Sequence, residues 1–315
     1  MTKTTALLAD PISREHLAGR DHPECPERFD AVLEGLRAAG LLDRLDAIAP
    51  RAATEDELLL CHTPAYLRTA RRDIASGAHY LSTGDTEVAP NSWEVAERAS
   101  GGVFNAVDAV VEGRARNAFC AVRPPGHHAN AIRGMGFCLF NNVALAARYA
   151  QRKHGLERVL IVDWDVHHGN GTQDIFYSDP SVFFFSTHQW PLYPGTGRAD
   201  ETGADGAEGT TMNFPLPAGS GRREILGAVR ERLLPAAREF CPGLVLVSAG
   251  FDSRIGDPLG GFTLTDEDFS ALTEAAMEIA DHTAGGRLVS VLEGGYSLTG
   301  LASAAAAHVA ALSTR

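Results

Sequence analysis

The chain has few cysteines, and their pattern excludes two kinds of architecture. There are five among 315 residues, an odd number, and no Cys-x-x-Cys pair occurs. A disulfide-stapled fold needs paired cysteines, and a zinc ribbon needs closely spaced ones. We therefore expect reduced thiols in a cytoplasmic protein at all five positions, which are Cys25, Cys61, Cys120, Cys138 and Cys241.

Long apolar runs and an excess of basic residues are also absent. No apolar stretch approaches membrane-spanning length, and the N-terminus lacks a basic segment followed by an apolar one. With 28 basic and 40 acidic residues the net charge is −12, which disfavours a surface that neutralises nucleic-acid phosphates. We expect neither a membrane nor a nucleic acid as partner. Acidity suits a cationic ligand such as a lysine-rich tail or a polyamine, although solubility alone also explains it.

The apolar residues that are present, 44% of the chain, alternate between strand-like and helix-like segments. Near-continuous apolar runs, typical of parallel strands covered on both faces, occupy residues 118–122, 159–162, 181–185, 244–247 and 288–292. Amphipathic helical patterns occupy residues 29–36, 142–153, 222–240 and 265–283, and a capping box occupies 54–57. The alternation predicts an α/β fold with an open, mainly parallel sheet and helices on both faces.

No low-complexity linker and no internal repeat divides the chain. We therefore predict a single domain over residues 1–315. Glycine- and proline-rich stretches around 194–209 and 215–221 are expected to be long ordered loops. The oligomeric state stays open.

Polar residues follow the predicted strands, where ligand sites of such sheets lie. The segment Arg158–Asn170 ends a buried apolar run in Asp163, Asp165 and His167, which project to one face of an extended strand. Two carboxylates and an imidazole are costly to bury without a cation, so the cluster predicts a metal site.

Asp165, His167 and Asp252 form a plausible three-ligand set, as in catalytic zinc sites that leave one position open. The same ligands would also bind Fe(II), Co(II) or Mn(II). Taken singly, Asp252 could cap a helix and His167 could be a core histidine. Their combination with Asp165 favours the metal.

His127 and His128 follow a Pro-Pro-Gly turn and are candidate proton carriers. Asp163 could orient one of them and Asn170 the other, and an amide and a carboxylate would give the two rings different proton affinities. Tyr296, after two glycines, could donate a hydrogen bond to an oxyanion. Each feature alone could be structural.

Phe137 and Tyr193 lie in glycine-containing loops. Two loop aromatics could wall a narrow channel for an aliphatic chain, and core packing explains them equally well.

Together these residues resemble the zinc-dependent histone deacetylase family, within the arginase–deacetylase fold. The resemblance runs from about His22 to the C-terminal helix and implies a sheet of about eight strands. It rests on the motifs Arg123-Pro-Pro-Gly-His-His128, Gly136-Phe-Cys138, Asp163-Trp-Asp-Val-His-His-Gly-Asn-Gly-Thr-Gln173, Gly250-Phe-Asp252, Gly256-Asp-Pro-Leu-Gly-Gly261 and Glu293-Gly-Gly-Tyr296. Asn170 and the last motif resemble the class II branch, especially class IIb and its bacterial relatives, including acetylpolyamine amidohydrolases.

The resemblance implies roles for the motif residues. One zinc ion is bound by Asp165, His167 and Asp252. The tandem histidines are His127 and His128, with Asp163 supporting His127, and Tyr296 polarises the acetyl carbonyl. The resemblance further implies a substrate-binding site formed by Gly136, Phe137, Tyr193, Leu259 and Asp85. It also implies that Arg28 lies beside an internal channel.

Members of this family also hold structural monovalent cations, usually potassium. The matching ligands of a first site are Asp163, Asp165, His167, Ser186 and Thr187. A second site would lie near Phe176, Asp179 and Val182.

Two departures from the family's polyamine-selective members favour acyl-lysine as substrate. Those members carry an acidic gatekeeper where this chain has Leu259, and an entrance-narrowing insertion that His22–Arg28 lacks. We therefore predict hydrolysis of N-acetyl amides, above all ε-acetyl-lysine side chains, by a zinc-activated water with the tandem histidines and a tyrosine. The alternatives are an acetylpolyamine amidohydrolase and a non-catalytic acyl-lysine-binding module. A dimetal ureohydrolase is disfavoured, because no further acid follows His168 where a second metal would need one.

Overall fold

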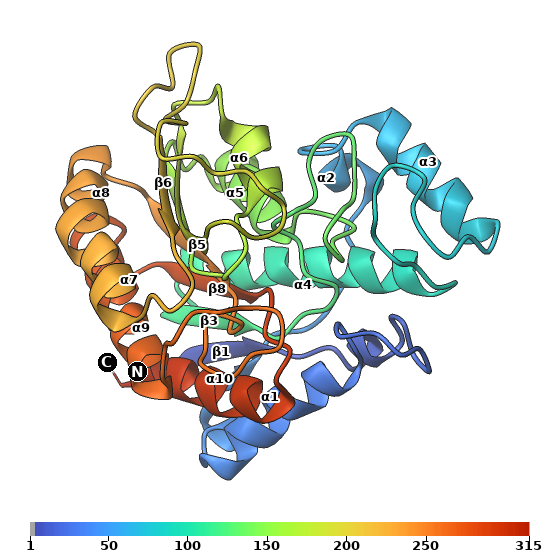
Figure 1. Ribbon diagram of the computed structural model, residues 1–315, viewed down its shortest axis with the longest axis horizontal. Coiled ribbons are helices and arrows are strands. Elements are labelled where there is room, and N and C mark those ends of the chain that lie inside the picture. The colour runs from blue at the N-terminus through green and yellow to red at the C-terminus, as the bar shows by residue number, and fades with distance from the viewer. Residues whose placement is uncertain (1–3, 315) are drawn as a thin grey trace.

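The computed structural model describes residues 4–314, which form a single eight-stranded sheet with helices around it (Figure 1). The strand order is β2-β1-β3-β8-β7-β4-β5-β6, and every neighbouring pair is parallel. This confirms the predicted sheet. The strands are Thr5–Leu8 (β1), Asp46–Ala47 (β2), Asn117–Cys120 (β3), Val159–Asp163 (β4), Val182–Gln189 (β5), Thr211–Leu216 (β6), Leu244–Ala249 (β7) and Leu288–Leu292 (β8).

Helices cover both faces of the sheet, as predicted (Figure 1). The α-helices are Glu27–Ala38 (α1), Glu55–Leu58 (α2), Pro64–Ala75 (α3), Ser92–Val111 (α4), Asn142–His154 (α5), Asn170–Phe176 (α6), Arg222–Ala228 (α7), Leu234–Phe240 (α8), Asp266–Thr283 (α9) and Leu298–Ser313 (α10). Short 3₁₀ segments span Pro11–Arg14 and Leu42–Arg44. The predicted domain ends, residues 1–3 and 315, lie outside the described residues.

Alternate strand residues supply two hydrophobic cores, one on each face. On β4, Val159 and Ile161 pack with the core formed by α3, α4 and α5, whereas Leu160 and Val162 pack with α1, α9 and α10. Successive strand residues point to opposite faces, so a strand covered on both sides needs an apolar residue at each position. This is why the strand sequences are continuous apolar runs rather than alternating ones.

Two local expectations need correction. Residues 215–216, expected in a loop, complete β6, an edge strand that tolerates Pro215 because an edge strand leaves some N–H groups without a ladder partner. The helix expected over 222–240 is interrupted by a π-helical turn at Val229–Leu233. Pro235, at the start of α8, has no N–H to donate to the carbonyl four residues earlier, which accounts for the wider turn.

The capping box predicted at residues 54–57 is present. Thr54 accepts a hydrogen bond from the Glu57 N–H at 3.2 Å, and the Glu57 carboxylate accepts one from the Thr54 N–H at 2.8 Å, as a capping box requires. The five cysteines are all free. Within residues 4–314, no helix combines the length and the apolar character that crossing a membrane requires.

Candidate active site

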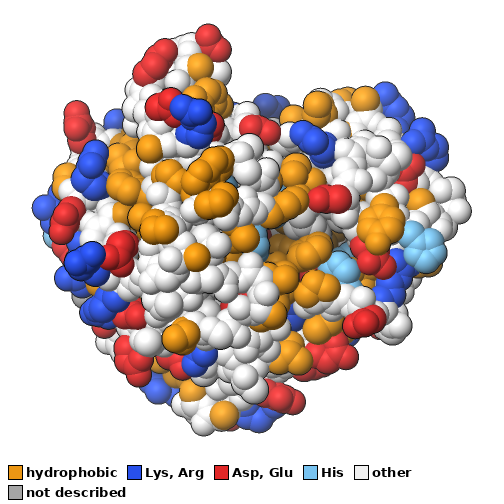
Figure 2. Space-filling view, in the orientation of Figure 1, with side chains coloured by type: hydrophobic (Ala, Val, Ile, Leu, Met, Phe, Trp, Pro, Cys, Tyr) orange, Lys and Arg blue, Asp and Glu red, His pale blue; other side chains and the backbone are white. Residues whose placement is uncertain are grey.

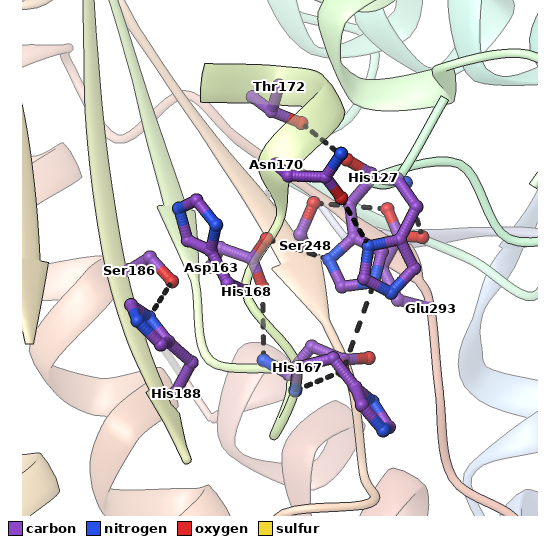
Figure 3. A network of polar contacts seen from close by, with 12 residues as sticks. His127, Asp163, His167, His168, Asn170, Thr172, Ser186, His188, Ser248 and Glu293 are labelled. Atoms are coloured by element: carbon purple, nitrogen blue, oxygen red, sulfur yellow. Dashed lines mark hydrogen bonds and ion pairs between the residues drawn. The ribbon is translucent and has the colours of Figure 1, made fainter. Parts of the chain in front are cut away.

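The predicted metal ligands and catalytic residues gather where β3, β4, β7 and β8 end, at one rim of the sheet (Figure 3). A cavity of about 350 Å³ opens there. Figure 2 shows apolar side chains around the hollowed middle of this face. The cavity is lined by Asp85, His128, Gly136, Phe137, His167, Leu192, Tyr193, Leu259 and Tyr296. All five residues expected to contact substrate are therefore brought to one cavity.

Asp165, His167 and Asp252 converge on one point at the bottom of this site. Their potential ligand atoms all lie within 4.8 Å of one another. Nδ1 of His167 is 3.0 Å from Oδ1 of Asp165 and 3.2 Å from Oδ2 of Asp252. Asp252 follows β7 and the other two follow β4, so adjacent parallel strands supply the set.

This donor set fits a divalent cation. Oδ2 of Asp252 is buried and has no hydrogen-bond partner, although it lies near His167. Burial and the Asp165 carboxylate together raise the pKa of Asp252 to about 7, because two buried negative charges repel each other. A metal ion between the three ligand atoms would satisfy the unpartnered oxygen and offset this repulsion.

Two glycines allow the carboxylates to pack this closely. A Cβ at Gly294 would lie 2.0 Å from Oδ2 of Asp252, and a Cβ at Gly250 would lie 2.2 Å from Oδ2 of Asp165. The Gly294 N–H also donates to Oδ2 of Asp165 at 2.8 Å. The backbone after β8 therefore forms one wall of the metal site, which only residues without a side chain permit.

The tandem histidines have different partners. Nδ1 of His127 lies 2.9 Å from Oδ2 of Asp163 (Figure 3), and Nδ1 of His128 lies 2.8 Å from Oδ1 of Asn170. Because both partners are acceptors, Nδ1 carries a proton in each ring, and in His128 the Nε2 atom is left to accept a second one. The expected pairing of Asp163 with His127 is present in the structure.

These partners move the two proton affinities in opposite directions. Burial alone would lower the pKa of His127, but the carboxylates of Asp163, Asp165 and Glu293 raise it well above the ordinary value. Burial and the neighbouring His127 and His167 hold the pKa of His128 well below the ordinary value. One ring is therefore suited to carry charge and the other to accept a proton.

The cavity walls come from three loops tied together by Asp85. Oδ1 of Asp85 accepts from the Gly136 N–H at 2.8 Å, and Oδ2 accepts from the Tyr193 hydroxyl at 3.0 Å. Phe137 has a left-handed backbone with φ +69°, and Gly136 has φ +56°. A Cβ at Gly136 would lie 2.3 Å from the His128 ring, so this position needs glycine for its conformation and for space.

Tyr296 reaches the cavity from the loop after β8. Its backbone N–H donates to Oδ2 of Asp257 at 2.7 Å, and the Arg28 guanidinium lies 4.9 Å from its ring centroid. Burial raises the pKa of Tyr296 well above its ordinary value, which keeps the hydroxyl protonated. Phe137 contacts the same ring edge-on, with centroids 5.9 Å apart.

Residues expected to hold potassium lie in two separate places. Ser186 pairs with Asp163 across β4 and β5, and its hydroxyl contacts the His188 ring at 2.9 Å. The hydroxyl of Thr187 is buried without a hydrogen-bond partner. In the turn between α6 and β5, the Asp179 N–H donates to the Phe176 carbonyl at 3.0 Å, and the Val182 N–H donates to the Asp179 carbonyl at 3.4 Å.

Three contributors were not assigned from the sequence: Leu192, Asp257 and Glu293. Leu192 lines the cavity but carries no chemical signal in a loop. Asp257 lies inside a family motif, and its position between two glycine turns was the available hint. Glu293 was noted only as part of a motif, yet its carboxylate hydrogen-bonds the turn that carries the histidines.

A second group of potential metal ligands lies at the C-terminal ends of α4 and α5 and consists of Asp108, Glu112 and His154. The Asp108 carboxylate already binds Nζ of Lys153 at 2.7 Å and Nε2 of His154 at 2.8 Å. A lysine ammonium in contact with the carboxylate takes the place that a cation would need, so this group is an ion-pair cluster.

Comparison with known proteins agrees with this geometry. Residues 22–312 match the family model described as histone deacetylase domain. The mouse polyamine deacetylase HDAC10 is 45% identical over 96% of this chain, and the human protein of that name is 44% identical over 90%. The chain spans only 45% and 44% of their lengths.

Two further matches cover most of the partner's length. A probable deacetylase of Archaeoglobus fulgidus is 39% identical over 91% of this chain and 79% of its own. The crystal structure of the HDA15 HD domain superposes with a TM-score of 0.92 at 38% identity, covering 98% of this chain and 89% of that one. The chain therefore belongs to the histone deacetylase domain family, as its strand-end motifs predicted.

Proposed function

We propose that this protein hydrolyses N-acetyl amides, with the ε-acetyl-lysine side chain as its first substrate class. One observation carries the proposal: a three-ligand metal set and two histidines with different hydrogen-bond partners share one rim with a cavity of about 350 Å³. Family membership and the names of the archaeal and mammalian relatives support it.

Asp165, His167 and Asp252 would hold the metal, which we propose to be zinc. When bound there, zinc supplies Lewis acidity that polarises a carbonyl and makes a neighbouring water more acidic. The ligand types alone also admit Fe(II) or Co(II), so the choice of zinc rests on the family.

The protein's own residues would divide the proton transfers. His128, with a lowered pKa, is neutral and accepts the proton of the attacking water at Nε2. Asn170 holds that ring through Nδ1 without adding charge. His127, held by Asp163, stays positively charged and stabilises developing negative charge nearby. After the transfer from water both rings are protonated, and the histidine pair then gives one proton to the leaving amine.

Tyr296 would donate its hydroxyl proton in a hydrogen bond to the carbonyl oxygen as that oxygen becomes negative. Its raised pKa keeps the donor protonated, and the Asp257 contact to its N–H fixes the loop. Phe137 and Tyr193 would exclude water from the aliphatic stem of the substrate.

Structural potassium ions are part of the proposal. The first would be held by Asp163, Asp165, His167, Ser186 and Thr187, and the second by Phe176, Asp179 and Val182. Support for the first comes from the buried, unpartnered hydroxyl of Thr187 and from the strand register that pairs Ser186 with Asp163. A cytoplasmic location is likewise proposed, supported by five free cysteines.

An acetylated polyamine is the second candidate substrate. The mammalian relatives are named polyamine deacetylases, and the Asp85 carboxylate lines the cavity where a free amine could pair with it. Against this, Leu259 presents an apolar side chain at the same cavity. An acyl-lysine stem is uncharged along its length and suits this lining better than a diamine.

The deciding experiment compares kcat/KM on an acetyl-lysine peptide and on N-acetylputrescine with the zinc-reconstituted enzyme. We expect the peptide to be preferred. The opposite order would make the protein a polyamine deacetylase. Absence of turnover on both, with one zinc bound per chain, would leave the non-catalytic acyl-lysine-binding module.

A further inference from the structure

Glu293 is a buried acid next to the site that takes no part in the proposed proton transfers. It follows β8, its side chain is fully buried, and it is not among the residues that line the cavity. In Figure 3 it lies beside His127 and Ser248. A buried carboxylate that makes no contact with substrate needs another reason to be there.

The carboxylate binds the turn that carries the histidines. Oε2 accepts from the Gly126 N–H at 2.6 Å and from the His127 N–H at 3.1 Å. Oε1 accepts from the Ser248 hydroxyl at 3.0 Å. Ser248 lies on β7 and pairs in register with Asp163 of β4, so one side chain connects the ends of three strands.

The backbone of the same residue extends the connection to the metal ligands. The Glu293 N–H donates to the Ala249 carbonyl at 3.1 Å, and its own carbonyl accepts from Nη2 of Arg28 at 2.5 Å. The next residue, Gly294, donates its N–H to Oδ2 of Asp165. Glu293 and Gly294 therefore link the histidine turn to the metal-ligand turn, in addition to the contact between His127 and Asp163.

We propose that Glu293 is a positioning residue whose carboxylate fixes the Gly126-His127 turn relative to the metal-ligand turn after β4. The inference rests on the proposed function and names a further determinant of its catalytic geometry. Nothing else in the described part of the chain is seen to accept these two N–H groups, so their loss would free the turn. A displacement of about 1 Å at a reacting group costs up to about 100-fold in rate.

The geometry predicts which substitutions of Glu293 keep the histidine turn in place. In Glu293→Ala both N–H groups lose their acceptor. In Glu293→Gln the amide oxygen can still accept from both, and the amide nitrogen can donate to the Ser248 hydroxyl oxygen. The glutamine should therefore restore what the alanine loses if position, and not charge, is what matters.

The kinetic test measures kcat and KM on an acetyl-lysine peptide for wild type, Glu293→Ala, Glu293→Gln and Ser290→Ala. Ser290 is the matched control, since it is buried on the same strand but bonds His308 on the far side of the sheet. We expect Glu293→Ala to lower kcat about 10- to 100-fold with KM within about twofold. Glu293→Gln should recover kcat to within about threefold of wild type, and Ser290→Ala should keep wild-type kcat.

A second readout does not depend on turnover. Amide hydrogen exchange should rise about tenfold or more at Gly126 and His127 in Glu293→Ala, and stay near wild type in Glu293→Gln. Residues 266–283 in α9 serve as the internal reference.

Three results would overturn the positioning role: unchanged exchange, unchanged kcat in the alanine variant, or a glutamine variant as impaired as the alanine one. Equal loss of kcat in Ser290→Ala would do the same, because it would indicate general destabilisation. An inactive wild type would refute the proposed function while leaving the exchange experiment valid.

Discussion

The hydrogen-bond partners of the tandem histidines differ by one charge. Asp163 adds a carboxylate to His127, and Asn170 adds only an amide oxygen to His128. Burial and the neighbouring His127 and His167 keep the pKa of His128 low, whereas Asp163 is one of three carboxylates that raise the pKa of His127. Two adjacent residues of the same type are thereby given different proton affinities.

The hydroxyl of Tyr296 should contribute mainly to the transition state. We expect Tyr296→Phe to lower kcat by about 10²- to 10³-fold with little change in KM, because the lost hydrogen bond forms only as charge develops. Steady-state kinetics on an acetyl-lysine peptide measures this. Tyr80→Phe, at a side chain that is 57% exposed, should leave both constants unchanged. Full kcat in Tyr296→Phe would remove the tyrosine from the mechanism.

Asp252 should be essential for metal retention. Asp252→Asn keeps the side-chain size but removes the charge on the unpartnered oxygen. We expect zinc affinity to fall by more than about 100-fold, since even outer-shell partners are worth about 10- to 100-fold. Competition with a zinc indicator measures the change. Asp200→Asn, on an exposed acid paired with Arg198, is the control. Unaltered affinity in Asp252→Asn would mean that another residue completes the site.

At the scale of elements, strand ends supply the chemistry and helices hold them in place. The metal ligands come from the adjacent strands β4 and β7, and the loops after β3 and β8 complete the rim. Parallel strands place all their carboxyl ends at one edge, so residues far apart in sequence meet there. The hydrogen bonds that cap the helices stabilise the helices around the sheet without touching the cavity.

Thr63 provides a test of that separation. Its hydroxyl accepts from the Tyr66 N–H at 3.2 Å and caps α3. We expect Thr63→Ala to lower the free energy of unfolding by about 1 kcal/mol with kcat/KM unchanged, whereas Thr63→Ser keeps the cap. Urea unfolding of the three proteins measures the effect. A loss of activity without a loss of stability would contradict this division.

The stability of the whole molecule should depend on pH through a buried histidine between α10, α9 and β8. Nδ1 of His308 lies 2.6 Å from the Thr273 hydroxyl, and Nε2 lies 2.8 Å from the Ser290 hydroxyl. The Thr273 proton goes to the Phe269 carbonyl, so that hydroxyl must accept from Nδ1. Burial lowers the pKa of the ring to about 3, so the ring is neutral at pH 7 with its proton on Nδ1.

A depressed pKa in a base means that acid favours the unfolded chain. Unfolded histidine takes up a proton below about pH 6.5, whereas folded His308 does so only near its lowered pKa. Stability is complete above the unfolded pKa and declines as pH falls below it. Between pH 7 and pH 5 this residue should cost about 2 kcal/mol. Urea unfolding at both pH values measures the effect. We expect the decrease in the free energy of unfolding between pH 7 and pH 5 to be smaller by this amount in His308→Gln. An equal decrease in both proteins would contradict the role of His308.

Local patterns predicted most of the sheet and most of the site. Continuous apolar runs located five of the strands, because a strand buried on both faces is apolar along most of its length. They missed β2 and β6, which lie at the two edges of the sheet, and β1, which is only four residues long. The ligand set and histidines were found because their residue types are rarely clustered by chance.

The sequence by itself determined the chemical groups: carboxylates, imidazoles and a phenol placed after apolar strands. Only the tertiary structure decided how they pair, because distances between strand ends depend on sheet order, which is not local. It put Asp163 on His127, left one oxygen of Asp252 without a partner, and turned Glu293 toward the histidine turn. Each of these contacts joins residues at least 36 positions apart or depends on burial, and no spacing rule along the chain encodes either.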